Sequence, residues 1–223
     1  MRLKKTIWFF TLFIFPAGLH AQKDVTEFLG IPVDGSKSEM LKKVTDKGFT
    51  ISPNEKDVLE GEFNGTDVFI IIATNNNKVR RLAVVDANPT NETNIKVRFN
   101  KLLRQFQNNK KYLPTEDSTL SKYIIPEDED ISYGPLVKKK AYQAVFYQKT
   151  TAYDSLASKQ EALYEQLDKV QTSDIVELAE KRINELYKCF NKKVWVNISK
   201  RSGGYVITIF YDNVYNEANG ENL

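Results

Sequence analysis

Residues 58–85 read VLEGEFNGTDVFIIIATNNNKVRRLAVV and contain three apolar segments separated by two turn signals. The Asn64-Gly65 pair is typical of a two-residue hairpin turn, because both residues tolerate a left-handed backbone. The Asn75-Asn76-Asn77 run predicts a second turn for the same reason. Short loops join antiparallel neighbours, so the stretch predicts a three-stranded β-meander. Its strands are Val58 to Phe63, Val68 to Ala73 and Val79 to Val85.

Helical patterns flank this meander on both sides. Ser36 and Glu39 have the spacing of a capping box, which predicts a helix that starts at Ser36 and ends near Gly48. A second helix is predicted from Asn91 to Asn108, because its apolar residues recur at helical spacing. We expect the apolar stripes of both helices to cover one face of the sheet. These stripes consist of Met40, Leu41 and Val44, and of Ile95, Phe99, Leu102, Leu103 and Phe106.

The C-terminal half predicts three more strands and a helical insertion. Lys140 to Gln148 is the fourth strand, and Val194 to Lys200 and Tyr205 to Tyr211 form the last pair. Residues 114–137 are interpreted as irregular. Between strands four and five, residues 149–192 contain two helical stretches, 153–170 and 173–190. The predicted fold class is therefore α+β: an antiparallel sheet of about six strands with helices packed on one face and a helical insertion, all within one domain over residues 22–223.

The first 21 residues are expected to form a cleavable signal peptide. Arg2, Lys4 and Lys5 precede a short apolar run, and Ala21 is a small residue at a plausible cleavage position. We therefore predict an exported protein, periplasmic or secreted, with no stable membrane insertion after cleavage. Cleavage would leave 29 basic and 29 acidic residues. This balance lacks the basic footprint of nucleic-acid binding, so pairs such as Arg80-Arg81 are interpreted as solvated faces.

Composition excludes several kinds of chemistry from the predicted mature chain. His20 is the only histidine and lies in the predicted signal peptide, and Cys189 is the only cysteine. Without histidine, the mature chain has no Ser-His-Asp or Cys-His site and no structural zinc site. We expect no cofactor and no metal. Chemistry that uses paired carboxylates remains open, because it needs only two acids.

The run Glu127-Asp128-Glu129-Asp130 is the first candidate site. Asp128, Glu129 and Asp130 could bind Ca²⁺ through hard oxygens or supply an acid/base pair. The alternative is an exposed acidic loop beside the basic run Lys138-Lys139-Lys140, and the residue pattern favours this alternative.

The segment that ends the chain is the second candidate. Asp212, Asn213 and Asn216 could converge on a ligand or a cation. The favoured alternative is that these side chains make local turns that cap the sheet and fix the C-terminus.

Aromatic residues on the last three strands form the third candidate. If one face of the sheet is uncovered, Tyr142, Tyr147, Trp195, Tyr205 and Tyr211 would give a tyrosine-rich platform for a protein or glycan partner. The alternative, which is favoured, is that these rings pack beneath the helices.

Several motifs together carry a resemblance to a known family. They are FLGIPVDGS at residues 28–36, LEGEF at 59–63, EDEDISY at 127–133, and YDN at 211–213 with NEANGE at 216–221. As a set they resemble an uncharacterised family of secreted or periplasmic proteins of Gram-negative gut bacteria. That family is similar in architecture to the β-lactamase-inhibitor-protein and outer-membrane-assembly lipoprotein folds, in which helices back a small antiparallel sheet. The resemblance implies a non-enzymatic binding module and brings no catalytic residues.

Two functions follow as hypotheses. The first is an exported binding or accessory protein whose partner is another envelope protein or a glycan. The second is a carboxylate-dependent hydrolase acting on glycans or envelope material. The hydrolase requires two of the acids Asp128, Glu129, Asp130, Asp212 and Glu217 to lie in one cleft, about 5–10 Å apart. A binding module has no such requirement.

Overall fold

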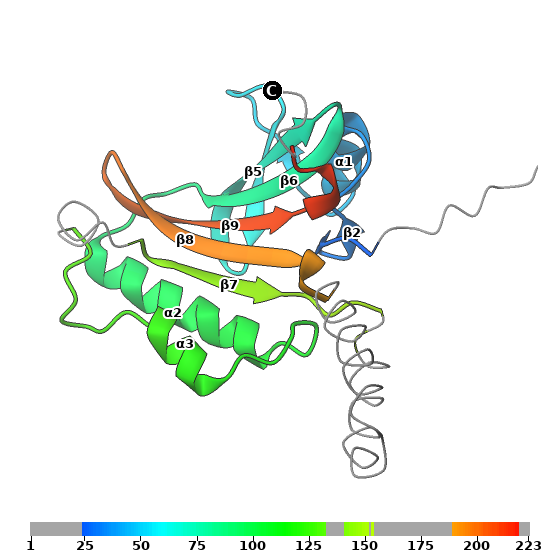
Figure 1. Cartoon of the computed structure of the whole chain (residues 1–223). Helices are drawn as coiled ribbons and strands as arrows, with labels where there is room; N and C mark the ends of the chain where they lie inside the picture. Colours follow the sequence, from blue (N-terminus) through cyan, green and yellow to red (C-terminus); the bar gives the residue numbers. More distant parts are fainter. Residues whose placement is uncertain (1–23, 133–140, 152, 154–188, 219–223) are drawn as a thin grey trace, which may run out of the picture.

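A computed structural model describes residues 24–132, 141–151, 153 and 189–218 of the 223-residue chain. The predicted signal peptide lies outside the described residues. Most of the predicted helical insertion, residues 154–188, also lies outside them. Within the described part the fold is α+β, as predicted (Figure 1).

The main sheet is antiparallel and has seven strands, where about six were predicted. Their order is β3-β4-β5-β6-β9-β8-β7. The additional strand is β3, a two-residue segment whose sequence carries no strand pattern of its own and which forms by pairing with the edge of β4. The strands are β3 (Thr50–Ile51), β4 (Val58–Phe63), β5 (Thr66–Asn75), β6 (Lys78–Asp86), β7 (Gln143–Tyr147), β8 (Lys193–Arg201) and β9 (Gly204–Asp212).

A smaller two-stranded sheet precedes the main one, and the described α-helices have between 7 and 17 residues. The small sheet contains β1 (Glu27–Phe28) and β2 (Ile31–Pro32). The α-helices are α1 (Lys37–Thr45), α2 (Glu92–Asn108) and α3 (Asp117–Tyr123), and the single 3-10 turns are η2 (Cys189–Asn191) and η3 (Val214–Asn216). Helix α3 lies in a region interpreted as irregular from the sequence. It spans only about two turns and is mostly polar, so it has little helical periodicity to detect.

The local turn and cap signals form as predicted. Asn64 and Gly65 have φ angles of 53° and 73°, and together they join β4 to β5. Asn76 and Asn77 adopt the same left-handed region between β5 and β6. Ser36 and Glu39 form the reciprocal capping box of α1. The β-meander is therefore confirmed, with β5 between β4 and β6.

One face of the sheet carries the hydrophobic core. Register places Ile70, Val84, Ile209, Val196 and Ala144 in one row across five strands, and all five are buried. The buried apolar residues of α1, α2 and α3 belong to the same core cluster, so all three helices pack on this core face. Figure 1 shows α2 and α3 side by side below β7, with α1 at the other end of the sheet near β5 and β6. Of the predicted helix residues, Leu41 alone is only partly buried.

Candidate functional site

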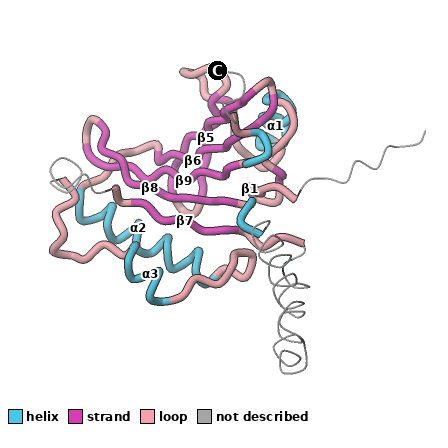
Figure 2. The backbone as a smooth tube through the Cα atoms, viewed as in Figure 1, coloured by secondary structure: helices cyan, strands magenta, loops and turns pink. Residues whose placement is uncertain are grey.

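The second face of the sheet, opposite the core face, carries one apolar row that crosses six strands. Side chains alternate between the two faces along each strand, so residues that pair across strands share a face. The register joins β4, β5, β6, β9, β8 and β7 in one row, which consists of Val58, Ile71, Ala83, Phe210, Trp195 and Val145. Figure 2 shows five of these strands, β5, β6, β9, β8 and β7, running beside one another. We call these six residues the apolar row.

Two aromatic rings form the centre of the apolar row. Trp195 and Phe210 are cross-strand partners, and their rings stack with centroids 4.0 Å apart at an interplanar angle of 19°. The guanidinium carbon of Arg81 lies 5.2 Å from the centroid of the indole and 5.0 Å from that of the phenyl ring. The Lys193 ammonium lies 5.7 Å from the indole centroid. Two cations thus flank an aromatic pair, an arrangement that cation–π attraction stabilises.

A buried carboxylate holds this cluster together. The side chain of Asp212 is fully buried, although it ends the last strand. Arg81 binds it in a bidentate manner, with Nε donating to Oδ1 and Nη2 donating to Oδ2 at 3.0 Å. The indole Nε1 of Trp195 donates to the same Oδ2 at 2.8 Å. The carboxylate therefore fixes the orientation of both the guanidinium and the indole.

Sequence reasoning named Trp195 and Asp212 in separate candidate groups and missed Arg81 and Phe210. The interpretation of Arg81 as a solvated residue is wrong, because its side chain is 25 % exposed and is paired with Asp212. The signal that could have found it is alternation: Arg81 interrupts an apolar strand on the face opposite Leu82. Its partner lies 131 residues further along the chain, so no local pattern reveals the pair.

The tyrosine-rich platform does not form on the second face. Tyr142, Tyr205 and Tyr211 are buried in the core cluster, beneath the helices. Burial raises the pKa of each phenol, and for Tyr142 the carboxylate of Glu129 raises it further. Of the five aromatic residues predicted together, only Trp195 and Tyr147 occupy strand positions whose side chains lie on the second face.

The acidic loop lies along α2, away from Asp212. Lys96 Nζ donates to the backbone carbonyls of Glu127 at 2.6 Å and of Glu129 at 2.9 Å. The Glu129 carboxylate accepts from Tyr142 Oη at 2.7 Å. The Asp130 carboxylate accepts from the backbone and side chain of Ser132, and Asp128 is exposed.

The acids that a hydrolase would need are thus not gathered around one described cavity. The loop contacts Tyr142 on the core side, whereas the Asp212 carboxylate is on the second face. Three cavities formed by described residues have linings that include none of Asp128, Glu129, Asp130, Asp212 and Glu217.

Asn213 and Asn216 join the end of the chain to its beginning. Asn213 Nδ2 donates to the Val33 carbonyl at 2.8 Å, and its Oδ1 accepts from the amide of Tyr215. Asn216 Nδ2 donates to Asp34 Oδ1 and to the carbonyl of Val79, both at 2.8 Å. Both amides are therefore engaged in holding the C-terminal segment against the N-terminal segment and β6.

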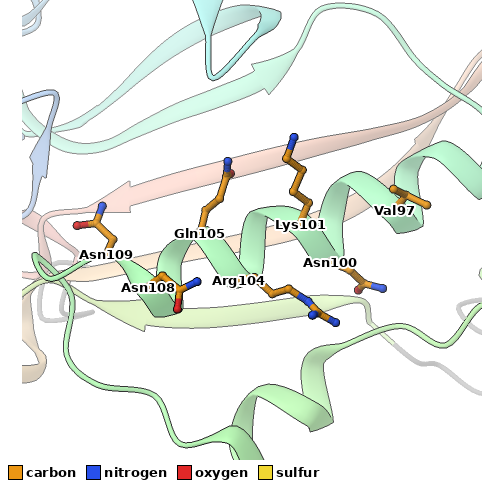
Figure 3. A pocket seen from close by; sticks show the side chains of 7 residues that line it. All are labelled: Val97, Asn100, Lys101, Arg104, Gln105, Asn108 and Asn109. Atoms are coloured by element: carbon orange, nitrogen blue, oxygen red, sulfur yellow. The ribbon is translucent and has the colours of Figure 1, made fainter.

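The outer side of α2 carries a hollow of about 630 Å³ (Figure 3). Every residue that lines it belongs to α2 or follows directly after it, and Figure 3 shows Lys101 and Gln105 pointing to one side of the helix while Arg104 points to the other. Its one aliphatic residue, Val97, is 61 % exposed. This surface differs from the apolar row because all of its residues except Val97 have a polar or charged group.

The part of the chain that the structure describes holds neither a cluster of metal ligands nor a membrane-spanning helix. No three His, Cys, Asp or Glu side chains are grouped there so as to hold a metal ion. No described helix has both the length and the apolar character needed to cross a membrane. Comparison of the chain with protein-family models, with curated proteins and with solved structures finds no match.

Proposed function

We propose that this chain is an exported, non-enzymatic binding protein that holds a protein partner on the second face of its sheet. The observation that carries the proposal is the apolar row. Ile71 in this row is 40 % exposed, Trp195, Phe210 and Val145 are half-buried, and Val58 and Ala83 are buried. The buried apolar residues of the described helices all belong to the opposite face. Exposed apolar patches of this kind mark interaction sites.

The composition of the row favours a macromolecular partner. Tryptophan and arginine are among the residues that most often dominate the free energy of protein–protein association. Trp195 and Arg81 are both held in place by Asp212 before any partner binds. A pre-organised side chain loses less entropy on binding, so the cluster is suited to anchor a partner.

A protein fits this surface better than a glycan does. A sugar ring binds an aromatic residue by stacking on a free ring face. In this cluster Phe210 stacks on the Trp195 indole, and the cations of Arg81 and Lys193 lie over it. The indole faces are therefore already in use. We infer that the partner contributes aliphatic side chains to the row and an acidic group near Arg81 and Lys193.

The test compares two lysine substitutions at exposed aliphatic residues. Ile71→Lys places a charge in the apolar row, whereas Val97→Lys places the same charge on the outer side of α2. The mature chain, immobilised, should retain a discrete protein from envelope extract of the native host. Ile71→Lys should abolish this retention and Val97→Lys should preserve it. If both variants retained the partner protein equally well, the proposal that the partner binds the second face would be wrong.

Export is a separate part of the proposal with its own measurement. The sequence of the N-terminal residues supports it, since a charged segment, a short apolar run and Ala21 occur in the expected order. N-terminal sequencing of the protein from the native host should begin at or near Gln22. An intact Met1 in the membrane fraction would contradict export.

A further inference from the structure

One edge of the main sheet ends in a strand without the usual protection. β7 is the last strand in the order, beside β8, and Figure 1 shows it as the outermost strand on that side. Its sequence, QAVFY, contains no charged residue and no proline. Proteins commonly protect an edge with charges, with proline or by keeping the edge strand very short. The opposite edge follows this rule, because β3 has only two residues, whereas β7 has five.

The pairing of β7 with β8 shows which of its backbone groups point outward. The amide of Ile198 in β8 donates to the carbonyl of Tyr142 at 3.0 Å. In an antiparallel pair, both backbone groups of one residue point the same way, and successive residues point to alternate sides. The even-numbered residues of β7 therefore bond to β8. The backbone groups of Gln143, Val145 and Tyr147 point away from the sheet.

Five of these six outward groups have no partner in the described part of the chain. The Tyr147 carbonyl accepts from the Leu113 amide at 2.8 Å. No hydrogen bond from a described residue reaches the N–H or C=O of Gln143 or Val145, or the N–H of Tyr147. Gln143 is exposed and Val145 is half-buried. Donors and acceptors in this alternation are the complement of an extended peptide backbone.

The segment that follows α2 closes one end of this open edge. Tyr112 forms a β-bridge with Gln148, and Leu113 bonds to Tyr147, so Leu113 occupies the position opposite Tyr147. The next residue, Pro114, forms no bridge with β7. Within the described chain, the four positions opposite residues 143–146 therefore stay open, over a length of about 13 Å.

The neighbouring side chains indicate what kind of segment fits these positions. Directly paired residues share a face, so a residue opposite Val145 would lie on the second face and extend the apolar row past its last member. On the core face, Phe146 is fully buried and stacks on Phe106 with centroids 4.8 Å apart. New apolar contacts therefore arise on the second face. The edge offers no charge to pair with, so an uncharged segment with a β-branched apolar residue opposite Val145 fits it.

We propose that β7 accepts a short extended segment of the partner protein as an additional strand, antiparallel to β7 and in line with Leu113. This inference rests on the proposed function, because it states how that partner reaches the apolar row. Backbone hydrogen bonds to Gln143 and Val145 hold the segment. A second copy of the chain does not fit: symmetric pairing of two β7 strands about Val145 would place the copy's Gln143 opposite Tyr147, where Leu113 lies.

Amide hydrogen exchange of the mature chain tests the open edge without a ligand. The amides of Gln143 and Val145 should exchange at least roughly 100-fold faster than those of Ala144 and Phe146, which bond to β8. Slow exchange at Val145, equal to that of its neighbours, would show that the edge is already covered and would overturn the proposal. Protection of Val145 that appears only at high protein concentration would assign the edge to a second copy and would overturn it too.

The probe is the peptide acetyl-Thr-Val-Thr-Val-Thr-amide, titrated into the ¹⁵N-labelled mature chain as two isomers. One isomer carries N-methyl groups on both valines and the other on the last two threonines. With a valine opposite Val145, the valine amides face β7 and the threonine amides face solvent. The threonine-methylated isomer should shift the amide resonances of Gln143 and Val145 saturably and slow the exchange of Val145. The valine-methylated isomer should bind at least about tenfold more weakly. Equal affinities, or no saturable shifts, would overturn the proposal.

Two substitutions of one residue separate the backbone from the side chain. Val145→Pro removes an outward amide, a change that edge strands tolerate, and should abolish peptide binding. Val145→Thr keeps the amide and the β-branch and should bind within about threefold of the unaltered chain. Unchanged binding by Val145→Pro would contradict strand addition. If that variant fails to fold, the comparison of the two N-methyl isomers still decides.

A third variant distinguishes this inference from the proposed function. Ile71 is in β5, four strands from β7, so Ile71→Lys should bind the peptide as the unaltered chain does. Failure of the peptide titration would therefore contradict strand addition alone. Retention of the partner protein by Ile71→Lys would contradict the proposed binding on the second face, whatever the peptide does.

Discussion

The indole Nε1 of Trp195 donates a 2.8 Å hydrogen bond to Oδ2 of Asp212, across the neighbouring strands β8 and β9. Trp195 pairs directly with Phe210, so Asp212 is its diagonal neighbour on the same face. The bond links an aromatic residue to a carboxylate that the sequence placed in a separate candidate group. This bond and the two hydrogen bonds from Arg81 to Asp212 hold the side chains of Trp195 and Arg81 in fixed positions on the second face.

The first prediction concerns the charge pair. Arg81→Ala should lower the free energy of unfolding by about 2–4 kcal/mol, because it leaves a fully buried carboxylate without its cation. The value is below that of a wholly buried pair, since the guanidinium is partly exposed to solvent. Urea unfolding measures it. Arg80→Ala, in the adjacent position, should change the stability by less than about 0.5 kcal/mol. A loss below about 1 kcal/mol in Arg81→Ala would mean that Asp212 does not depend on Arg81.

The second prediction concerns the packing of α2 on the core face. Phe99 is fully buried, so Phe99→Ala should lower the free energy of unfolding by about 3–5 kcal/mol. Val97→Ala, two residues earlier on the exposed side, should change it by less than about 0.5 kcal/mol. Chemical denaturation of both variants gives the comparison. Similar small losses in both would show that α2 is peripheral to the core.

The third prediction concerns acid stability. Burial raises the pKa of Asp24, but hydrogen bonds from the Lys192 ammonium and from Thr151 outweigh it and leave the pKa below the ordinary value of 3.8. A depressed carboxyl pKa stabilises the fold above the unfolded pKa, and this contribution is lost as pH falls through the folded pKa. Asp24→Asn should therefore be less stable than the unaltered chain at pH 6, and the difference should shrink towards pH 2.

The control for that titration is Asp67→Asn, at an exposed carboxyl of β5 that forms no ion pair with a described residue. Its unfolding free energy should run parallel to that of the unaltered chain across the same pH range. A deficit in Asp24→Asn that stayed constant from pH 6 to pH 2 would rule out the ion pair with Lys192 as its cause.

The fourth prediction concerns metal ions at the acidic loop. Lys96 already supplies a cation to the carbonyls of Glu127 and Glu129. Millimolar Ca²⁺ and a chelator should therefore give superimposable thermal melts. Lys96→Met should lower the free energy of unfolding by about 1–3 kcal/mol, because it leaves both carbonyls without their donor. The exposed Lys101→Met is the control. A Ca²⁺-dependent rise in Tm that Asp128→Asn abolishes would turn the loop into a metal site.

Local signals in the sequence predicted the elements, because the atoms that decide them are close along the chain. Ser36 and Glu39 cap α1, and Asn64-Gly65 turns the first hairpin, through contacts that span three residues or fewer. The strand β3 and the helix α3 were missed because each is too short to show a period. Both depend on contacts made elsewhere in the fold.

The site was less predictable, because it depends on register and on pairs far apart in the chain. Trp195 pairs with Val145, so these two side chains share a face, whereas Ala144 pairs with Val196 on the other face. Tyr142 is two residues before Ala144 and therefore lies on the face opposite Trp195. This assignment needs the register of β7 and β8, which the sequence does not contain. The prediction that grouped these aromatic residues by strand therefore combined residues of the core face with residues of the second face.

The most direct test of the central claim, that a protein binds the second face, is site-specific photo-crosslinking in the native host. A photoreactive p-benzoylphenylalanine replaces Ile71 in one strain and Val97 in another, since both side chains are exposed. The account predicts one discrete protein adduct from position 71, lost when Trp195→Ala is added, and none from position 97. Adducts from position 97 alone, or an adduct at position 71 that persists in Trp195→Ala, would contradict it.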